Sequence, residues 1–288
     1  MRFQLYTDVK AFYRDTCGVL MRHEAQNVLP LGNLMIGCAG RDREGWRDPA
    51  NWLMAAVSDD TGVRLTALMT PPHNLTLYAT DNRFDDSVLI CLIDGLNAAG
   101  IVLPGVTTEK ALAGRFAGLY TDANSLKSRV LVNQRIYELT QVNPAIPSAG
   151  SLRLARESDM AFLPYWFAGF QSDCFGRDCN IAAIAADARY HAGTRKLYIL
   201  EDAGTPVSMA KLNREMQTVG CIGFVYTPPY FRGRGYASAC VAGVSRRILE
   251  AGYRKCALYT DLANPISNSI YQKIGYTPIC DSLQIAFE

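Results

Sequence analysis

The stretch 226–237 constrains the fold more than any other part of this 288-residue chain, because it joins an apolar strand to a helix through a glycine-rich loop. It reads Tyr-Thr-Pro-Pro-Tyr-Phe-Arg-Gly-Arg-Gly-Tyr-Ala. The apolar run 221–225 before it predicts a buried strand, and residues 238–251 after it carry apolar side chains at helical spacing. The predicted order is therefore strand, proline-closed turn, glycine-rich loop and helix.

This order of elements predicts a binding site for anions. Gly233 and Gly235 let the backbone turn sharply and approach a ligand closely. The unpaired N–H groups of the first helical turn point toward the loop, where the helix dipole favours a negative group such as pyrophosphate. Arg232 and Arg234 add positive charge beside it. The alternative is an ordinary solvated turn, since a single glycine-rich loop is a weak signal.

Two other phosphate-binding loops do not fit the stretch. A Walker loop requires Gly-Lys followed by Ser or Thr, which is absent here. A dinucleotide fold requires Gly-x-Gly-x-x-Gly after a first strand, whereas this loop comes late and lacks the third glycine. The spacing of Arg232, Gly235 and Ala237 instead resembles Arg/Gln-x-x-Gly-x-Gly/Ala, the acyl-CoA signature of the GCN5-related N-acetyltransferases (GNAT superfamily).

A second stretch, residues 264–276, resembles a later motif of the same family, Asn-x-x-Ala-x-x-x-Tyr-x-x-x-Gly-Phe. Asn264 and Tyr271 match the motif, whereas Ser267 replaces the Ala and Tyr276 replaces the Phe. The two motifs occur in the family's order, with a predicted helix and strand between them. Their joint occurrence makes a chance match improbable.

The resemblance implies a reaction, a cofactor and a set of site residues. It implies that an acetyl group passes from acetyl-CoA to a primary amine of a small molecule or peptide, leaving CoA as product. Tyr271 would protonate the departing thiolate, because a phenol with a pKa of about 10 carries its proton at neutral pH. The strand end would pair through its backbone with pantetheine and offer an N–H to the thioester carbonyl. The implied cofactor-binding residues are Phe224, Val225, Tyr226, Arg232, Gly233, Arg234, Gly235, Tyr236, Ala237, Asn264 and Ser267.

Alternative roles stay open for several of these residues. Tyr271 also suits a core aromatic packed against the sheet, and Asn264 suits a helix N-cap. The run 220–226 has no carboxylate, although many family members carry a general base there. Other candidates for the base, each more typical of a solvated surface charge, are Glu215, Asp261 and Asp173. Two further functions therefore remain: a CoA-binding sensor or assembly module without turnover, and an acyltransferase for longer acyl groups that resembles glycine N-acyltransferases.

Length and internal similarity predict two related domains, residues 1–143 and 151–288. Both halves carry an acidic turn between two strands and a helix that ends at Ala-Gly. Residues 80–86, which take the place of the glycine-rich loop in the first half, contain three acids and no glycine. Gly114 takes the place of Tyr271 when Gly118-Leu-Tyr-Thr is aligned with the end of the second half. We expect a degenerate GNAT-like N-terminal domain and a C-terminal domain that binds acetyl-CoA.

The predicted fold class is α/β (α+β), with two tandem GNAT-like domains, each a mixed, mostly antiparallel central sheet flanked by helices. Expected strands are 52–57, 63–69, 75–79, 101–103, 127–139, 151–155, 196–200, 207–213, 221–225, 256–260, 276–279 and 283–287. Expected helices are 8–28, 87–99, 108–118, 157–170, 180–191, 238–251 and 264–273. Loops are expected at 38–49 and 171–178, and a linker at 141–150.

Composition limits the partners and the compartment. A net charge of +2 argues against a nucleic-acid-binding surface. No apolar run is long enough to span a bilayer, and the N-terminus lacks the apolar core of a signal peptide. Nine cysteines without a Cys-x-x-Cys pair indicate reduced thiols, and the three histidines are too scattered for a metal site. We expect a cytoplasmic enzyme with no metal, membrane or nucleic-acid partner; a homodimer is left open.

Overall fold

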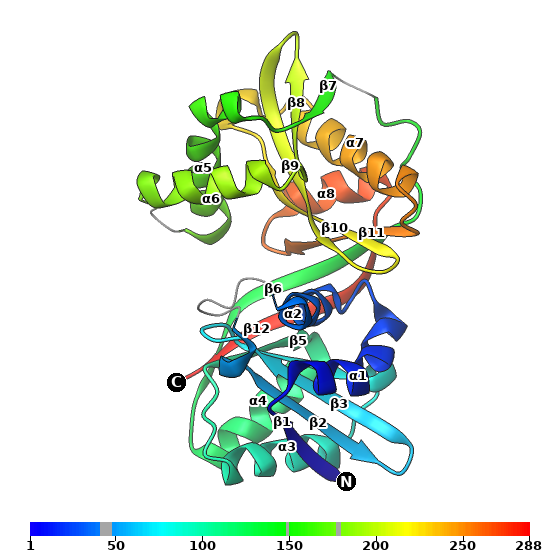
Figure 1. Cartoon of the computed structure of the whole chain (residues 1–288), viewed down its shortest axis with the longest axis vertical. Helices are drawn as coiled ribbons and strands as arrows, with labels where there is room; N and C mark the ends of the chain where they lie inside the picture. The colour runs from blue at the N-terminus through cyan, green and yellow to red at the C-terminus, as the bar shows by residue number, and fades with distance from the viewer. Residues whose placement is uncertain (41–47, 148–149, 177–179) are drawn as a thin grey trace. The chain divides into compact units, whose positions relative to one another are not determined.

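The computed structural model describes residues 1–40, 48–147, 150–176 and 180–288, and the chain divides into two compact units (Figure 1). Unit 1 comprises Met1–Ile136, Thr260–Ala263 and Pro278–Glu288, and unit 2 comprises Tyr137–Tyr259 and Asn264–Thr277. The units therefore exchange short segments, whereas the predicted domains are continuous stretches. Parts of the expected loops and linker (41–47, 148–149 and 177–179) lie outside the described residues.

Unit 1 is a sheet with helices on its two faces. Its elements are β1 (Arg2–Tyr6), α1 (Val9–Leu20), η1 (Met21–His23), α2 (Val28–Ala39), η3 (Pro49–Asn51), β2 (Leu53–Asp59), β3 (Gly62–Met69), β4 (Leu75–Ala79), η4 (Thr80–Asn82), α3 (Asp86–Ala98), β5 (Gly105–Glu109), α4 (Lys110–Asn124) and β6 (Ser128–Leu139). The strand order is β1-β2-β3-β4-β5-β12-β6. Strands β4 and β5 are parallel, whereas the pairs β1–β2, β2–β3, β3–β4 and β5–β12 are antiparallel. Leu65, Leu92 and Phe116 are buried between this sheet and helices α3 and α4.

The rest of the chain repeats the same succession of elements, of which all but the last, β12, lie wholly or mainly in unit 2. They are β7 (Ser151–Leu154), η5 (Glu157–Ala161), α5 (Leu163–Phe175), α6 (Ile181–Gly193), β8 (Leu197–Asp202), β9 (Thr205–Glu215), β10 (Val219–Tyr226), η6 (Pro229–Phe231), α7 (Tyr236–Glu250), β11 (Lys255–Asp261), α8 (Pro265–Ile274) and β12 (Thr277–Phe287). The strand order is β6-β11-β10-β9-β8-β7. Strands β10 and β11 are parallel, whereas the pairs β9–β10, β8–β9 and β7–β8 are antiparallel. The mixed, mostly antiparallel sheet confirms the predicted fold class.

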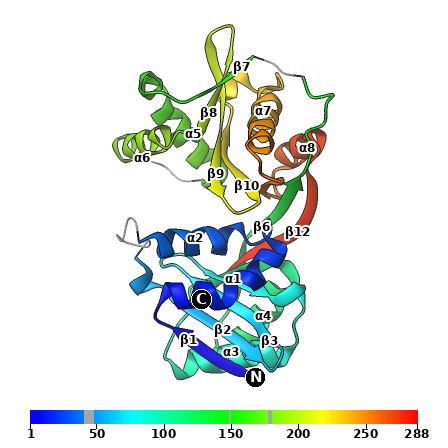
Figure 2. The same cartoon turned by 45° about the vertical axis from the view of Figure 1, so that its right-hand side comes forward.

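Helices cover both faces of the sheet in unit 2, as Figures 1 and 2 show. Helices α7 and α8 close one core, in which Val244, Ile248 and Ile274 are buried. Helices α5 and α6 close a second core, around Phe167 and Met209. The apolar residues of the helix predicted at 238–251 thus face the sheet, as their spacing indicates.

The last strand of the second repeat, β12, lies almost wholly in unit 1, and the end of β6, the last strand of the first repeat, lies in unit 2. Residues Ser282–Ala286 of β12 pair antiparallel with β5, and Ile285 is buried in the core of unit 1. The end of β6 belongs to unit 2, where Tyr137 and Leu139 are buried and Glu138 forms an ion pair with Lys255 (Nζ–Oε2 2.8 Å). The strands predicted at 276–279 and 283–287 form the single strand β12.

Several predicted boundaries were wrong for identifiable reasons. Residues 101–103 form no strand; the Leu103 N–H donates to the Tyr120 hydroxyl (3.0 Å), and β5 begins at Gly105. Helix α4 runs to Asn124, so Gly118 lies inside it and does not mark its end. Helix α5 continues through the expected loop to Phe175 and ends at Gly176, whose φ of 61° suits a helix C-terminus.

The segment 141–147, expected to be a linker, is part of unit 2 and contacts the end of α8. The Asn143 N–H donates to the Ile274 carbonyl (2.8 Å), and its side chain donates to the Lys273 carbonyl (3.1 Å). These bonds satisfy carbonyls at the end of α8 that have no partner within the helix.

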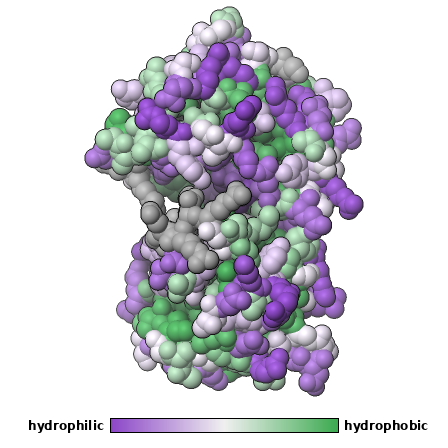
Figure 3. Space-filling model, in the orientation of Figure 1, coloured by the Kyte–Doolittle hydropathy of each residue, from purple (hydrophilic) through white to green (hydrophobic). Residues whose placement is uncertain are grey.

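The surface is mixed in hydropathy. Hydrophilic and hydrophobic side chains are interspersed over the face drawn in Figure 3. Among the described residues, no helix combines the length and apolar character needed to cross a bilayer.

Candidate functional site

The glycine-rich loop forms an uncapped helix start, as its sequence predicts. Helix α7 begins at Tyr236, and its N-cap residue Gly235 has φ 80° and no side chain to accept the first N–H groups. Gly233 has φ 77°. The first bond within the helix runs from Ala239 N–H to the Gly235 carbonyl (3.0 Å), so the preceding N–H groups of the first turn have no partner in the helix. This end of α7 has the geometry and the dipole to hold an anion.

Arg232 does not stand free beside this loop. Its Nε donates to the Thr227 carbonyl (2.9 Å), and its guanidinium forms an ion pair with Asp173 on α5. The guanidinium also lies 5.8 Å from the centre of the Tyr226 ring. Arg232 therefore ties the loop to α5 and to the end of β10, while Arg234 is exposed.

The strands β10 and β11 pair only at their beginnings. Their parallel ladder pairs Val219–Cys221 with Lys255–Ala257. Among the described residues the pairing ends there, although β10 continues to Tyr226 and β11 to Asp261. The backbone of 222–226 thus lacks its neighbour on that side. An extended ligand with amide groups can pair with such an edge.

The free end of β10 also carries a bulge. Three residue steps on β10, from Gly223 to Tyr226, match two steps on β9, from Lys211 to Met209. Phe224 lies inside this bulge with φ 53°, which is strained for a residue other than glycine. The side chains alternate as predicted for core residues: Phe224 and Tyr226 pack toward α5, and Val225 packs in the core beneath α7.

Helix α8 presents the predicted phenol on its buried side. The Asn264 side chain accepts the Ser267 N–H (3.0 Å), so Asn264 is the N-cap of α8. Tyr271 is 7% exposed, and its hydroxyl forms no hydrogen bond among the described residues. Burial, followed by the nearby Cys174, raises the pKa of this hydroxyl above its ordinary value of 10.0. The phenol is therefore held protonated.

Two residues that the sequence analysis missed contact these elements. Tyr137, from β6, donates its hydroxyl to Asn268 on α8 (3.0 Å), and its ring centre lies 6.3 Å from that of Tyr271. Asp202, at the end of β8, accepts the hydroxyl of Tyr236 at the start of α7. Neither lies in a motif, so only long-range packing reveals them.

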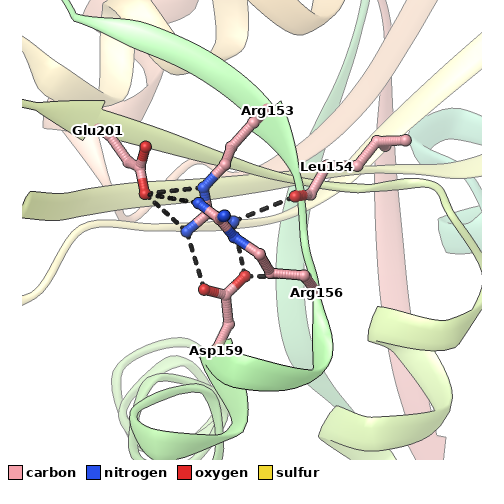
Figure 4. Close-up of polar contacts among 5 residues, drawn as sticks. All are labelled: Arg153, Leu154, Arg156, Asp159 and Glu201. Carbon is pink, nitrogen blue, oxygen red and sulfur yellow. Dashed lines mark hydrogen bonds and ion pairs between the residues drawn. The ribbon is translucent and has the colours of Figure 1, made fainter. Parts of the chain in front are cut away.

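An ionic cluster anchors the strand that carries Asp202. Arg153 on β7 donates two parallel bonds to Asp159 (2.7 and 2.8 Å) and one to Glu201 (2.7 Å), as Figure 4 shows. Asp159 is 3% exposed and also accepts the Arg156 N–H (2.9 Å). Such bidentate pairs fix geometry as well as charge. The cluster holds β7 and η5 against the end of β8.

The three carboxylates considered as general bases all have partners. Glu215 forms an ion pair with Lys196 and accepts the Tyr253 hydroxyl (3.0 Å). Asp261 accepts the Ala263 N–H (2.8 Å), and Asp173 pairs with Arg232.

The comparisons with known proteins agree on one fold. Residues 204–285 match the family model described as FR47-like protein. A GNAT-family acetyltransferase from Colwellia psychrerythraea is 11% identical, with 100% of this chain and 99% of that chain covered at a TM-score of 0.60. A GCN5-related N-acetyltransferase from Sphaerobacter thermophilus is 16% identical, with 99% and 95% covered at 0.62. A tandem GNAT protein from the clavulanic acid biosynthesis pathway is 12% identical, with 100% and 98% covered at 0.54.

The chain has the tandem GNAT fold. No curated protein matches its sequence. At these identities, the structural likeness establishes the fold of the chain and leaves its chemistry to its own residues.

In unit 1, the helix that corresponds to α7 is α3, and it begins differently. The N-cap of α3 is Asp85, whose carboxylate accepts the Val88 N–H (3.2 Å) and so places negative charge where an anion would bind. Phe116 follows the N-cap of α4 by seven residues, as Tyr271 follows Asn264. Counting from the N-cap thus replaces Gly114 with Phe116 as the counterpart of Tyr271, and the phenol is still absent.

Proposed function

We propose that unit 2 transfers an acyl group, most simply acetyl from acetyl-CoA, to a primary amine of a small molecule or peptide. The observation that carries this proposal is the juxtaposition of an uncapped α7 start with a β10 edge that is open beyond Cys221. The first feature suits the pyrophosphate of CoA, and the second suits the amides of its pantetheine arm. Unit 1 serves as a structural part of the chain in this proposal.

The proposed binding residues fall into groups according to the part of CoA that each would contact. The N–H groups of Gly233, Gly235, Tyr236 and Ala237 face the pyrophosphate, and Arg234 adds charge. The backbone of Phe224, Val225 and Tyr226 pairs with pantetheine and offers an N–H to the thioester oxygen. Asn264 and Ser267 lie at the start of α8, near the proposed pantetheine path. Arg232 acts indirectly, because its guanidinium is held by Asp173 and Thr227.

Tyr271 is proposed as the general acid. As the amine attacks the thioester carbonyl, the C–S bond breaks and the sulfur leaves with the electron pair. The Tyr271 hydroxyl gives its proton to that sulfur, and its raised pKa keeps the proton available throughout the neutral range. No metal takes part in this scheme.

The binding step can be tested by placing an acid in the first turn of α7. Ser238 lies in the first turn of α7, so Ser238→Asp places a carboxylate at the proposed pyrophosphate site while favouring the helix dipole. We expect Ser238→Asp to weaken CoA binding by about tenfold or more, because like charges brought together cost more than ~1.4 kcal/mol. Ser238→Asn is the matched neutral control. Equal CoA affinities in calorimetry for the two variants would exclude this site.

The reaction requires a separate assay. Thiol release from acetyl-CoA and from longer acyl-CoAs, measured over a panel of amines, peptides and polyamines, distinguishes three outcomes. Turnover with acetyl-CoA supports the proposal, and preference for longer chains supports a glycine N-acyltransferase-like activity. CoA binding without turnover on any amine supports a sensor or assembly module, which is favoured by the fact that Glu215, Asp261 and Asp173 are all engaged elsewhere.

The setting proposed for this reaction is the cytoplasm. The eight cysteines that the structure describes as free are consistent with a reducing compartment. A homodimer remains compatible with the proposal, and sedimentation of the full chain decides it.

A further inference from the structure

A buried lysine lies in unit 2, on the face of the sheet that α5 and α6 cover. Lys211 on β9 is 4% exposed, and its Nζ lies 2.5 Å from Nδ1 of His191 on α6. A lysine is rarely buried, because transfer of its charged form out of water is costly. The His191 imidazole can accept a hydrogen bond from the amine in its neutral form. The contact therefore suits an amine that exchanges a proton with its neighbour.

The imidazole continues the contact toward solvent. His191 Nε2 lies 3.3 Å from a carboxylate oxygen of Asp187, one turn earlier on α6. Because Nδ1 faces a donor and Nε2 faces an acceptor, the neutral ring carries its proton on Nε2. The side chain of His191 is 11% exposed and that of Asp187 is 44% exposed. The three groups thus lead stepwise from a buried amine to water.

The inner end of this chain lies at the bulge of β10. Lys211 is the direct ladder partner of Gly223, the residue before strained Phe224. The Phe224 ring centre lies 5.5 Å from Lys211 Nζ and 4.5 Å from the His191 ring centre. The bulge is where the backbone is proposed to meet the thioester carbonyl. Lys211 therefore lies beside this bulge.

We infer that Lys211, His191 and Asp187 form a proton relay that removes the ammonium proton of the acceptor. The inference rests on the proposed function and supplies the base that β10 lacks. The acceptor's N–H bond breaks and its proton joins neutral Lys211 Nζ, which passes a proton to His191 Nδ1. His191 then releases its Nε2 proton to the Asp187 carboxylate, which gives it to water. One proton crosses from the acceptor to solvent, and no electrons are exchanged with any other group. The step leaves His191 with its proton on Nδ1, so the ring must return to the Nε2–H form by proton exchange with water before the next turnover.

The other side chains around the imidazole are mainly aromatic. Phe167 from α5 stacks on it (ring centres 5.4 Å apart), Tyr190 from α6 meets it edge-on (5.3 Å), and β10 contributes Phe224. Three titratable side chains contact His191: that of Lys211 from β9, and those of Asp187 and Tyr190 from α6. The pH response is attributed to these groups.

The tautomer provides a test that needs no substrate. The chain has three histidines, so 15N-histidine NMR of the full protein resolves them, and the signal lost in His191→Gln identifies His191. We expect the Nε2–H tautomer, and a shift of the Nδ1 signal in Lys211→Met. Methionine preserves the apolar stem of the lysine, and replacing a buried ionisable group by an apolar one is often neutral for stability. An Nδ1–H tautomer overturns the relay.

The pH profile provides the second test. An alkylamine loses its own proton near pH 10, so the relay is needed below that pH and dispensable near it. We expect His191→Gln and Lys211→Met to lower kcat by about 10²-fold at neutral pH, the usual contribution of general-base catalysis, and the loss to disappear as pH approaches 10. Asp187→Asn should show the same trend with a smaller loss.

His23→Gln is the matched control, because His23 in unit 1 also contacts a side chain, the Tyr78 hydroxyl (3.0 Å). It should keep the wild-type profile. A loss in His191→Gln that is equal at all pH values, or no loss, overturns the relay and leaves the proposed function intact. Absence of turnover by the wild type on every amine, with CoA binding retained, overturns both.

Discussion

At the residue scale, the proposed reaction depends most directly on the hydroxyl of Tyr271. Tyr271→Phe removes the proton donor and keeps the ring, so kcat should fall by about 10²-fold, as for loss of a general acid. Because burial raises the pKa of the hydroxyl above 10.0, the donor stays protonated, and the loss should be constant from pH 6 to 9. Thiol-release rates over that range provide the measurement. Rates equal to those of wild type would remove Tyr271 from the mechanism.

Glycine is needed at positions 233 and 235 because of the backbone conformation there, and not because a side chain would clash with its neighbours. A Cβ added at either residue would meet no atom within 4 Å, but the φ values of 77° and 80° disfavour L-residues. Gly235→Ala should therefore lower the free energy of unfolding by about 1–2 kcal/mol and weaken CoA binding. Gly114→Ala is the control, since Gly114 has equally open space inside α4 and should gain about 0.5–1 kcal/mol. Urea unfolding of the two variants compares these changes, and equal effects would contradict the conformational argument.

At the scale of elements, α8 depends on its N-cap. Asn264→Ala leaves the Ser267 N–H without its acceptor, and the free energy of unfolding should fall by about 1 kcal/mol. Ser269→Ala, on the exposed face of the same helix, should be neutral or slightly stabilising because alanine has the higher helix propensity. Denaturant unfolding measures both. A loss in Ser269→Ala as large as that in Asn264→Ala would mean that the cap contributes nothing.

The helix α7 and its neighbours carry thiols that make stability fall in alkali. Burial raises the pKa of Cys240 from 9.0 to about 12, so the folded chain keeps a proton that the unfolded chain releases above pH 9. The contribution is fully present below pH 9 and is lost as pH rises toward 12, at about 1.4 kcal/mol per pH unit. Cys240→Ala should reduce the slope of unfolding free energy against pH by that amount, whereas Ser269→Ala, which removes no ionisable group, should leave the slope unchanged. An unchanged slope in Cys240→Ala would refute the assignment.

The elements were largely predictable because their signals are local. Apolar spacing located α7, and the Asn-Pro start located α8, to within two residues. The predicted helix ends at residue 170, too early for α5, because Gln171, Ser172 and Asp173 are polar and resemble a loop. The exposed last turn of a helix is polar as well. Lys211 and His191 were missed because nothing local indicates that a lysine is buried. Their contact joins β9 to α6, and sequence spacing does not encode such a contact.

At the scale of the whole molecule, the exchange of last strands was also beyond sequence analysis. The alternation of Leu283 and Ile285 shows that one face of β12 is buried, but not which sheet receives it. The predicted boundaries assign β12 to the second domain because it follows α8 directly. In the structure, the register of Ser282–Ala286 with β5 places it in unit 1.

This exchange makes the C-terminus a determinant of the N-terminal unit's stability. Ile285 is 4% exposed in the core of unit 1, and Ile274, eleven residues earlier, is 0% exposed in the core of unit 2. Each Ile→Ala change should cost about 2–5 kcal/mol, but in opposite units. Hydrogen exchange should show faster opening of β2 and β3 in Ile285→Ala, and of β9 and β10 in Ile274→Ala. If Ile285→Ala instead accelerated exchange in β9 and β10 and spared β2 and β3, β12 would stabilise its own repeat and the exchange of strands would be wrong.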